Sequence, residues 1–434
     1  MKTEQLYEIY LQHPIVTTDS RDCPPNSIFF ALKGATFNGN LYAASALEKG
    51  CAYAVVEKEF APEDDERYIA VENPEKALQD LAAYHRQQLS IPVLQITGTN
   101  GKTTTKELIA CVLQEAHNVL YTEGNLNNHL GVPRTLLRIT KEHDIAVIET
   151  GANHPGEIAF LCNMVKADYG LITNVGRAHL EGFGSFSGVK KTKGELYDDL
   201  QQRKATIFLN ALDEDLLKMA EERGFHLFER AIPYVEGRIE DCNPFVKMQW
   251  RKDVDTPWQA IQTHLIGAYN ISNLRAAITI GLHFGITPEQ IRHAIENYVP
   301  SNSRSEFRNT GKNSLIVDAY NANPSSMIAA LTNFQFIDSK HKMVILGDMR
   351  ELGADSEIEH RKIMDILAGM PLEEVWLVGE NFASLGYPNK RISPKYFKDV
   401  EAVIEELQSK PLTDRTILIK GSNGTKLFQL PNYL

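Results

Sequence analysis

The pattern of apolar and polar positions becomes regular at about residue 91. From there, short apolar runs alternate with helical stretches, beginning with IPVLQIT at 91–97 and a helix expected from Lys102 to about Glu115. The next apolar runs predict strands at Ile145–Thr150, Tyr169–Thr173 and Ala205–Asn210. Strands that alternate with helices favour a parallel sheet with crossover helices. We therefore expect a central α/β domain over residues 89–299.

The segments on either side of this region also read as α/β. Residues 1–88 mix short apolar runs, at Ser27–Leu32 and Tyr53–Val56, with helical stretches and turns rich in Gly and Asn. The strand–helix alternation resumes after Pro300, with strands expected at Ser314–Tyr320, Lys342–Gly347, Glu374–Val378 and Arg415–Lys420. The sequence thus predicts three α/β domains, with a small one at residues 1–88 and a Rossmann-like one at residues 300–434.

Composition narrows the class of protein. The 434 residues carry a formal net charge of −11, which should repel nucleic acid. The segment MKTEQLYEIY is polar, and no apolar run is long enough to cross a bilayer. The five cysteines are scattered and predict free thiols in a reducing compartment. We expect a cytoplasmic protein, most simply a monomer, that acts on small molecules, binds no nucleic acid and does not insert into membranes.

The strongest chemical signal is a glycine-rich turn between the run at 91–97 and the following helix. Its residues are Gly98, Thr99, Asn100, Gly101, Lys102, Thr103 and Thr104. Glycines let the backbone N–H groups curl around phosphate oxygens, and the helix N-terminus adds positive charge. Lys102 would neutralise the β- and γ-phosphates, and Thr103 would bind Mg²⁺. The strict P-loop spacing fails at Ile96, where its first glycine belongs, so an ordinary strand–turn–helix connection is the alternative.

Two more polar residues follow strands at the same predicted sheet edge. Glu149 ends the run at 145–150, and His179 follows the run at 169–173. Open α/β sheets bind ligands at the carboxyl ends of their strands, so Glu149 could complete the coordination of Mg²⁺. The alternatives are a glutamate that faces a helix dipole and a structural histidine.

Three lysines, Lys190, Lys191 and Lys193, begin the next helical stretch. Such a group usually forms a solvated basic face of a helix. The functional alternative is that one of these lysines is directed into the phosphate site.

Several motifs together resemble the Mur ligase family. They are TGTNGKTT at 97–104, GNLNNHLGVP at 124–133, IETGANHPGEI at 148–158, AHLEGFGSF at 178–186, DAYNANPSSM at 318–327, LGDMRELG at 346–353 and IKGS at 419–422. Asp19-Ser20-Arg21 and FFALKG at 29–34 match as well, so the resemblance covers nearly the whole chain. GANHPGEI combined with YNANP is typical of the branch that adds D-alanyl-D-alanine. The Asp-Asn-Pro-Arg motif usual in the diaminopimelate- or lysine-adding branch is missing from the sequence.

The resemblance implies a division of labour among the three domains. The first domain would hold a UDP-sugar substrate, the central one ATP, and the third would close over the nucleotide. The implied cofactors are ATP and two Mg²⁺ ions, with Thr103, Glu149 and His179 as metal ligands. Lys193 aligns with a lysine that is carbamylated in relatives, and its carbamate would support the second Mg²⁺.

The resemblance also implies contacts with the other ligands. Asn270 and Asn273 match adenine-side positions, Arg304 the interdomain arginine, and Asp318 a ribose-binding aspartate. The implied substrate contacts are Asp19, Ser20, Arg21, Asn125, Asn127, Asn128, Asn321 and Asn323. The chain departs from the family's usual His, Gly and Arg at Tyr269, Ser303 and Asn423.

The implied activity is ATP-dependent ligation of D-alanyl-D-alanine to UDP-N-acetylmuramoyl-tripeptide in peptidoglycan precursor synthesis. A substrate carboxylate would attack the γ-phosphorus to give an acyl phosphate, and the dipeptide amine would then expel phosphate. Lys102, His179 and Lys193 form the expected catalytic set, and either His179 or a carboxylate could take the amine proton.

Two other interpretations of the sequence stay open. Another ligase of the superfamily, such as a folylpolyglutamate synthase, would lack the first domain. From a different class, a P-loop switch or NTP-driven binding module would lack a third domain that contributes Arg304 and Asp318 to the nucleotide.

Overall fold

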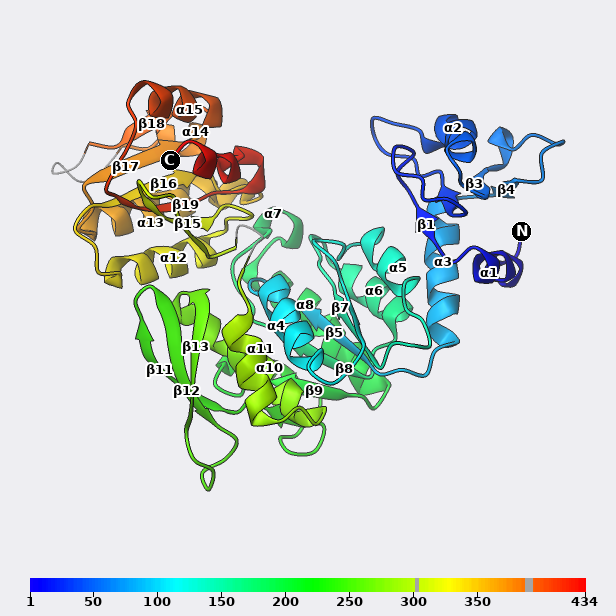
Figure 1. The fold of residues 1–434 in the computed structure, drawn as a ribbon, viewed down its shortest axis with the longest axis horizontal. Coiled ribbons are helices and arrows are strands. Elements are labelled where there is room, and N and C mark those ends of the chain that lie inside the picture. Colours follow the sequence, from blue (N-terminus) through cyan, green and yellow to red (C-terminus); the bar gives the residue numbers. More distant parts are fainter. Residues whose placement is uncertain (301–303, 387–392) are drawn as a thin grey trace.

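The computed structural model describes residues 1–300, 304–386 and 393–434. The chain forms three α/β units, each with its own sheet, and a separate small antiparallel sheet. In Figure 1 the first unit (blue) and the last unit (yellow to red) lie at opposite ends, with the central unit between and below them. The predicted three-domain α/β fold is confirmed.

The first unit is built on four parallel strands in the order β1-β2-β3-β4. They are β1 (Val16–Thr17), β2 (Ile28–Phe30), β3 (Tyr53–Glu57) and β4 (Tyr68–Val71), and the helices are α1 (Thr3–Gln12), α2 (Ala43–Glu48) and α3 (Pro74–Gln87). Helix α3 begins where the Asn73 side chain accepts a hydrogen bond from the Lys76 N–H, with Pro74 at the first helical position. Its apolar face, including Leu81, shares one core with the central unit, so α3 connects the two units (Figure 1).

The central unit has six parallel strands in the order β10-β9-β8-β5-β7-β6. They are β5 (Val93–Thr97), β6 (Val119–Tyr121), β7 (Ile145–Glu149), β8 (Tyr169–Ile172), β9 (Thr206–Leu209) and β10 (Ala231–Pro233). The helices are α4 (Lys102–Leu113), α5 (Gly131–Leu136), α6 (Glu157–Val165), α7 (Leu180–Phe183), α8 (Phe186–Gln202), α9 (Glu214–Glu221), α10 (Ile271–His283) and α11 (Pro288–Asn297). All residues of β5 and β7 are buried because helices cover both faces of the sheet, which explains their unbroken apolar runs.

A three-stranded antiparallel sheet follows, which the sequence analysis did not predict. Its strands are β11 (Glu236–Cys242), β12 (Phe245–Arg251) and β13 (Gln259–Ile266). Val246, Met248 and Trp250 alternate along β12 and are buried, whereas the intervening side chains face outward. This period of two was visible in the sequence and is typical of a sheet that packs on one face only.

The last unit has six strands in the order β14-β15-β19-β16-β17-β18. They are β14 (Glu306–Asn309), β15 (Ser314–Asp318), β16 (Lys342–Gly347), β17 (Glu374–Val378), β18 (Lys395–Phe397) and β19 (Thr416–Lys420). The helices are α12 (Pro324–Phe336), α13 (Ser356–Gly369), α14 (Glu380–Ala383) and α15 (Val400–Ser409). Only the edge strand β14 runs antiparallel to its neighbour. Two apolar clusters lie on the two faces of this sheet, as in an open, doubly wound fold.

Two predictions from composition can be compared with the structure. All five cysteines are free thiols, as expected. Within the described residues, no helix combines the length and the apolarity needed to cross a bilayer.

Candidate active site

The candidate active site is a cavity of about 730 Å³ that the central and last units line together. Strands β8, β5 and β7 are neighbours in the central sheet, so their carboxyl ends meet at one edge. The phosphate-loop turn follows β5, Glu149 ends β7, and His179 follows β8. The prediction that these residues share one sheet edge is therefore confirmed by the strand order.

The phosphate loop depends on two glycines. Gly98 and Gly101 have φ angles of +145° and +76°. A Cβ atom at Gly98 would lie 2.0 Å from Thr173 Oγ1, and one at Gly101 would lie 2.9 Å from Asn273 Oδ1. Since other residues would meet both backbone strain and a collision, glycine is required at both positions.

Lys102 begins helix α4 directly after this loop. Its Nζ donates hydrogen bonds to the carbonyl oxygens of Gly98, over 2.9 Å, and Thr99, over 3.1 Å. Burial lowers the pKa of Lys102, nearby Glu149 opposes this shift, and nearby Arg304 adds to it. The ammonium group thus lies over the concave side of the loop, where bound phosphates would replace the carbonyls as its partners.

Glu149 is fully buried at the end of β7. Its Oε1 accepts hydrogen bonds from Thr103 Oγ1, over 3.2 Å, and from Asn127 Nδ2, over 2.8 Å. Its Oε2 has no hydrogen-bond partner among the described residues, and the nearest cation is the buried Lys106, whose Nζ lies 4.0 Å away. A buried carboxylate oxygen without a donor is costly, so this site favours a cation beside Thr103.

His179 and Lys193 both lie near Lys102 of the phosphate loop. His179 has a φ of +50°, and its Nδ1 contacts Glu351 Oε2 from the last unit. Lys193 on α8 is only 2% exposed, and its Nζ lies 5.5 Å from the centre of the Phe183 ring. Burial, together with the positive charge of the nearby Lys102, lowers the pKa of Lys193 to about 7.

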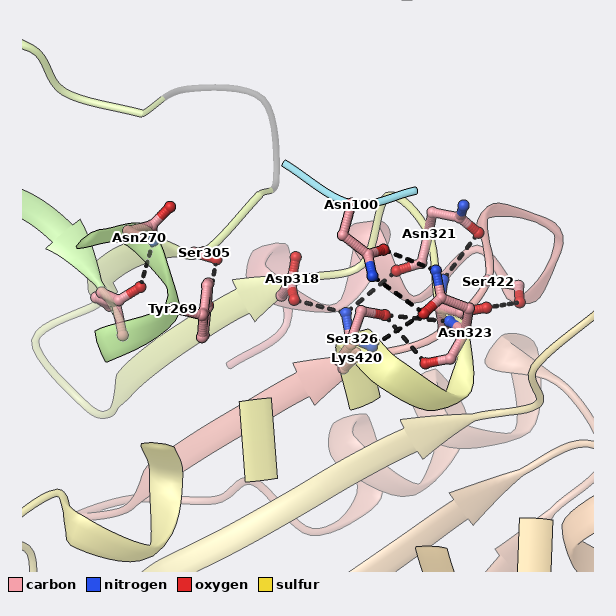
Figure 2. Close-up of polar contacts among 12 residues, drawn as sticks. Asn100, Tyr269, Asn270, Ser305, Asp318, Asn321, Asn323, Ser326, Lys420 and Ser422 are labelled. Carbon is pink, nitrogen blue, oxygen red and sulfur yellow. Dashed lines mark hydrogen bonds and ion pairs between the residues drawn. The ribbon is translucent and has the colours of Figure 1, made fainter. Parts of the chain in front are cut away.

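Four other predicted residues line the cavity, on either side of the domain junction. Asp318 ends β15, and its Oδ2 accepts a 2.6 Å hydrogen bond from the buried Lys420 (Figure 2). The Arg304 guanidinium lies 3.8 Å from the centre of the Tyr320 ring. Asn273 Nδ2 donates to Asn270 Oδ1 over 2.8 Å. The two units thus bring polar groups to the same cavity.

Direct hydrogen bonds join the two units at the phosphate loop. Asn323 Nδ2 donates to Asn100 Oδ1 over 2.7 Å (Figure 2). The Arg177 N–H donates to Ser325 Oγ over 3.2 Å. Asn323 also caps α12, because its Oδ1 accepts a hydrogen bond from the Ser326 N–H.

A second cavity of about 210 Å³ adjoins the first and shares His179, Asn321, Glu351 and Asn423 with it. Its further lining includes Arg350, whose Nη2 donates to the Gly424 carbonyl over 3.3 Å and whose backbone N–H donates to Ser422 Oγ over 3.0 Å. Adjacent residues of opposite charge, Arg350 and Glu351, therefore lie around one small pocket.

The structure gathers many of the predicted residues but not all. Those that line the large cavity are Thr99, Asn100, Gly101, Lys102, Thr104, Asn125, Asn127, Asn128, Glu149, His179, Asn270, Asn273, Arg304, Asp318 and Asn321. Asn323 lines the small cavity. Asp19, Ser20 and Arg21 line neither cavity, and Asp19 instead pairs with Arg21 over 2.7 Å at the surface of the first unit. Ser303 lies outside the described residues.

Sequence reasoning missed several groups at the site. Lys106, Lys420, Arg350 and Glu351 were not singled out individually, although Lys420, Arg350 and Glu351 lie inside the quoted motifs. Lys106 follows Lys102 by about one helical turn, and this spacing places both on nearby faces of α4.

The fold and the cavity define a class of protein: a P-loop nucleotide-binding α/β protein in which a second domain completes the nucleotide site. Three family models match the chain, namely the Mur ligase family catalytic domain at residues 14–86, the Mur ligase middle domain at residues 96–281, and the Mur ligase glutamate ligase domain at residues 303–423. The chain belongs to the Mur ligase family.

Individual relatives support this assignment along the whole chain. The UDP-N-acetylmuramoyl-tripeptide–D-alanyl-D-alanine ligase of Escherichia coli strain K12 is 34% identical over 419 residues, which cover 95% of this chain and 91% of the relative. The solved structure of MurF from Acinetobacter baumannii has a TM-score of 0.85 at 29% identity and covers 100% of this chain and 97% of that one. The MurF of Thermotoga maritima, solved in complex with ADP, shares the fold with a TM-score of 0.83 at 22% identity, over 98% of this chain and 97% of that one.

Proposed function

We propose that this protein is the ATP-dependent ligase that joins D-alanyl-D-alanine to UDP-N-acetylmuramoyl-tripeptide. The observation that carries the proposal is the single cavity of about 730 Å³ in which the phosphate loop meets Arg304 and Asp318 of the last unit. Relatives that align over nearly the whole chain bear the name of this ligase. The substrates are small molecules, and the expected partners of the protein include neither nucleic acid nor membrane.

The chemistry proceeds in two steps within this cavity. The terminal carboxylate of the tripeptide attacks the γ-phosphorus of ATP, forming an acyl phosphate and releasing ADP. The amine of the dipeptide then attacks the acyl carbon, loses a proton and expels phosphate. Lys102 compensates phosphate charge, and the walls contributed by two units exclude water from the acyl phosphate. No side-chain nucleophile is needed for either step.

The residues around Glu149 fit a magnesium ion. Thr103 Oγ1 and Glu149 lie within hydrogen-bond distance of each other, and Glu149 Oε2 is a buried oxygen without a donor. Mg²⁺ commonly keeps several water ligands and is bound through one or two carboxylates plus substrate phosphates. Thr103 and Glu149 would hold the ion, which supplies charge stabilisation at the γ-phosphate. His179 is the third proposed ligand.

Lys193 is proposed to carry a carbamate that supports a second Mg²⁺. The residue is 2% exposed, and Lys102, Glu157 and Glu195 lie near its amine. A neutral amine adds to the carbon of CO₂ and releases one proton, leaving a carbamate anion at a position where Lys102 supplies the opposite charge. The lowered pKa of Lys193 provides the neutral amine near pH 7.

The small cavity is proposed to hold the dipeptide. D-Alanyl-D-alanine is a small zwitterion, and the pocket of about 210 Å³ offers Arg350 for its carboxylate and Glu351 for its ammonium group. Because this pocket shares His179 and Asn321 with the large cavity, the dipeptide amine would face the acyl phosphate. The first unit, with Asp19, Ser20 and Arg21, is proposed to hold the UDP end of the other substrate.

Mass detection of the product from UDP-N-acetylmuramoyl-tripeptide, D-alanyl-D-alanine and ATP tests the activity. We expect the ligated product together with stoichiometric ADP and phosphate, and no ATP turnover when either co-substrate is omitted. Product with a folate and glutamate instead would identify a folylpolyglutamate synthase. ATP hydrolysis without any acceptor would indicate an NTP-driven binding module.

A further inference from the structure

A tyrosine hydroxyl crosses the junction between the central and last units. Tyr269, in the short turn before α10, has its OH 2.6 Å from Ser305 Oγ, which lies just before β14 of the last unit (Figure 2). The tyrosine ring lies over the backbone of Gly267, where a Cβ atom would be 2.3 Å from Tyr269 Cε1. The ring thus occupies the space that a side chain at position 267 would need, and its hydroxyl reaches the other unit.

Ser305 has an unusual backbone conformation. It is 8% exposed, and its φ of +54° lies in the left-handed region that serine seldom adopts. A residue stays in this conformation when neighbouring contacts determine it. The hydrogen bond with Tyr269 is such a contact, and it fixes the turn that carries Arg304.

The turn matters because Arg304 lines the nucleotide cavity. Its guanidinium stacks on the Tyr320 ring at 3.8 Å and is close enough to Lys102 to lower the pKa of that lysine. Tyr269, Arg304, Ser305 and Tyr320 all line the cavity. A shift of the turn would therefore move a cation inside the nucleotide site.

The segment that carries Tyr269 also contacts the phosphate loop. Asn270 accepts a hydrogen bond from Asn273, and Asn273 Oδ1 accepts one from Thr105 Oγ1 over 3.0 Å while packing against Gly101. One short stretch of chain, 269–273, thus lies between the phosphate loop and the Arg304 turn.

We propose that Tyr269 is a positioning residue that, through Ser305, holds Arg304 in the nucleotide cavity. The inference rests on the proposed use of ATP but not on the identity of the other substrates. At the position where the family commonly has histidine, this chain thus has a tyrosine whose hydroxyl contacts the other domain. Loss of this contact should weaken nucleotide binding selectively.

The test is a double-mutant cycle with Tyr269→Phe and Ser305→Ala, each of which removes only a hydroxyl. Dissociation constants for ADP, from calorimetry, and KM for ATP are measured for both variants and for the double variant. We expect each single variant to lose about three- to tenfold in nucleotide affinity, the usual effect of one hydrogen bond, and the double variant to lose no more than either. The KM for the other two substrates and the melting temperature should stay unchanged.

Two controls separate this role from a general structural one. Tyr396→Phe removes the hydroxyl that donates to the Leu385 carbonyl, away from the cavity, and should change neither constant. In an Arg304→Ala background, Tyr269→Phe should cause no further loss of affinity, because the tyrosine acts through that arginine. Unchanged ADP affinity in both single variants, additive losses in the double variant, or an equal loss with and without Arg304 would each overturn the proposal. If ADP binds as expected but no ligation occurs, the proposed function fails while this inference stands.

Discussion

Asn323 Nδ2 donates a hydrogen bond to Asn100 Oδ1 over 2.7 Å, which links the cap of helix α12 to the phosphate loop. The two asparagines belong to different units and are far apart in the sequence, so their contact depends on how the central and last units are placed. Since α12 begins directly at Asn323, the position of the phosphate loop and the orientation of this helix are coupled.

We expect the two units to close further around bound nucleotide. Small-angle scattering should show a smaller radius of gyration with a non-hydrolysable ATP analogue than without it. Asn100→Ala removes this side-chain contact but leaves the cap of α12 intact, and it should reduce the change. An unchanged radius in the wild-type protein with all ligands present would count against closure.

Replacing Lys102 with alanine should abolish ligation and leave the fold intact. Without this cation the phosphate charge is uncompensated, and loss of one such contact typically lowers the rate about 10²–10³-fold. Steady-state kinetics measures the rate, and circular dichroism checks the fold. Lys218→Ala, at an exposed position on α9, is the matched control. Near-normal kcat in folded Lys102→Ala would show that the phosphates bind elsewhere.

Glu149→Gln should raise the magnesium concentration needed for half-maximal activity. The amide keeps the size of the side chain and its hydrogen bond to Thr103, but it removes the negative charge that attracts the ion. A magnesium titration of the rate at saturating ATP would measure the shift. Glu142→Gln, in an exposed turn, should behave like the wild type. An identical titration for both variants would remove Glu149 from the proposed metal site.

Lys193→Ala should be nearly inactive, and a short carboxylate added to the medium should partly restore activity. Because CO₂ reacts only with the neutral amine, and the pKa of Lys193 is lowered to about 7, carbamate-dependent activity should fall as the pH drops below about 7. Isotopically labelled bicarbonate would reveal the carbamate by NMR. The exposed Lys191 provides the control variant, Lys191→Ala. Full activity of Lys193→Ala in both normal and CO₂-depleted buffers would disprove the assignment.

Arg350→Ala should raise the KM for D-alanyl-D-alanine about tenfold or more, with little effect on the KM for ATP. The arginine is the proposed partner of the dipeptide carboxylate, and a hydrogen bond to a charged group contributes about 1.5–3 kcal/mol. Initial rates at varied dipeptide measure the change. Arg361→Ala, at an exposed position on α13, is the control. Equal changes in both KM values would place Arg350 in the nucleotide site instead.

Much of the fold could be predicted because local pattern and burial coincide. The apolar runs that predict β5, β7 and β8 are buried on both faces in the structure, and glycines mark the phosphate loop where positive φ is needed. The antiparallel sheet was not predicted, although Val246, Met248 and Trp250 alternate with less buried residues along β12.

The sequence by itself determined the three-unit α/β organisation, the phosphate loop, and the placement of Glu149 and His179 after strands. Only the tertiary structure decided which distant groups meet them. Lys106 lies beside Glu149, Glu351 contacts His179, and Tyr269 reaches Ser305. Strands and glycine turns follow from interactions between residues close in the chain, whereas these pairings depend on the packing of elements that are distant in the chain, which no local pattern of residues encodes.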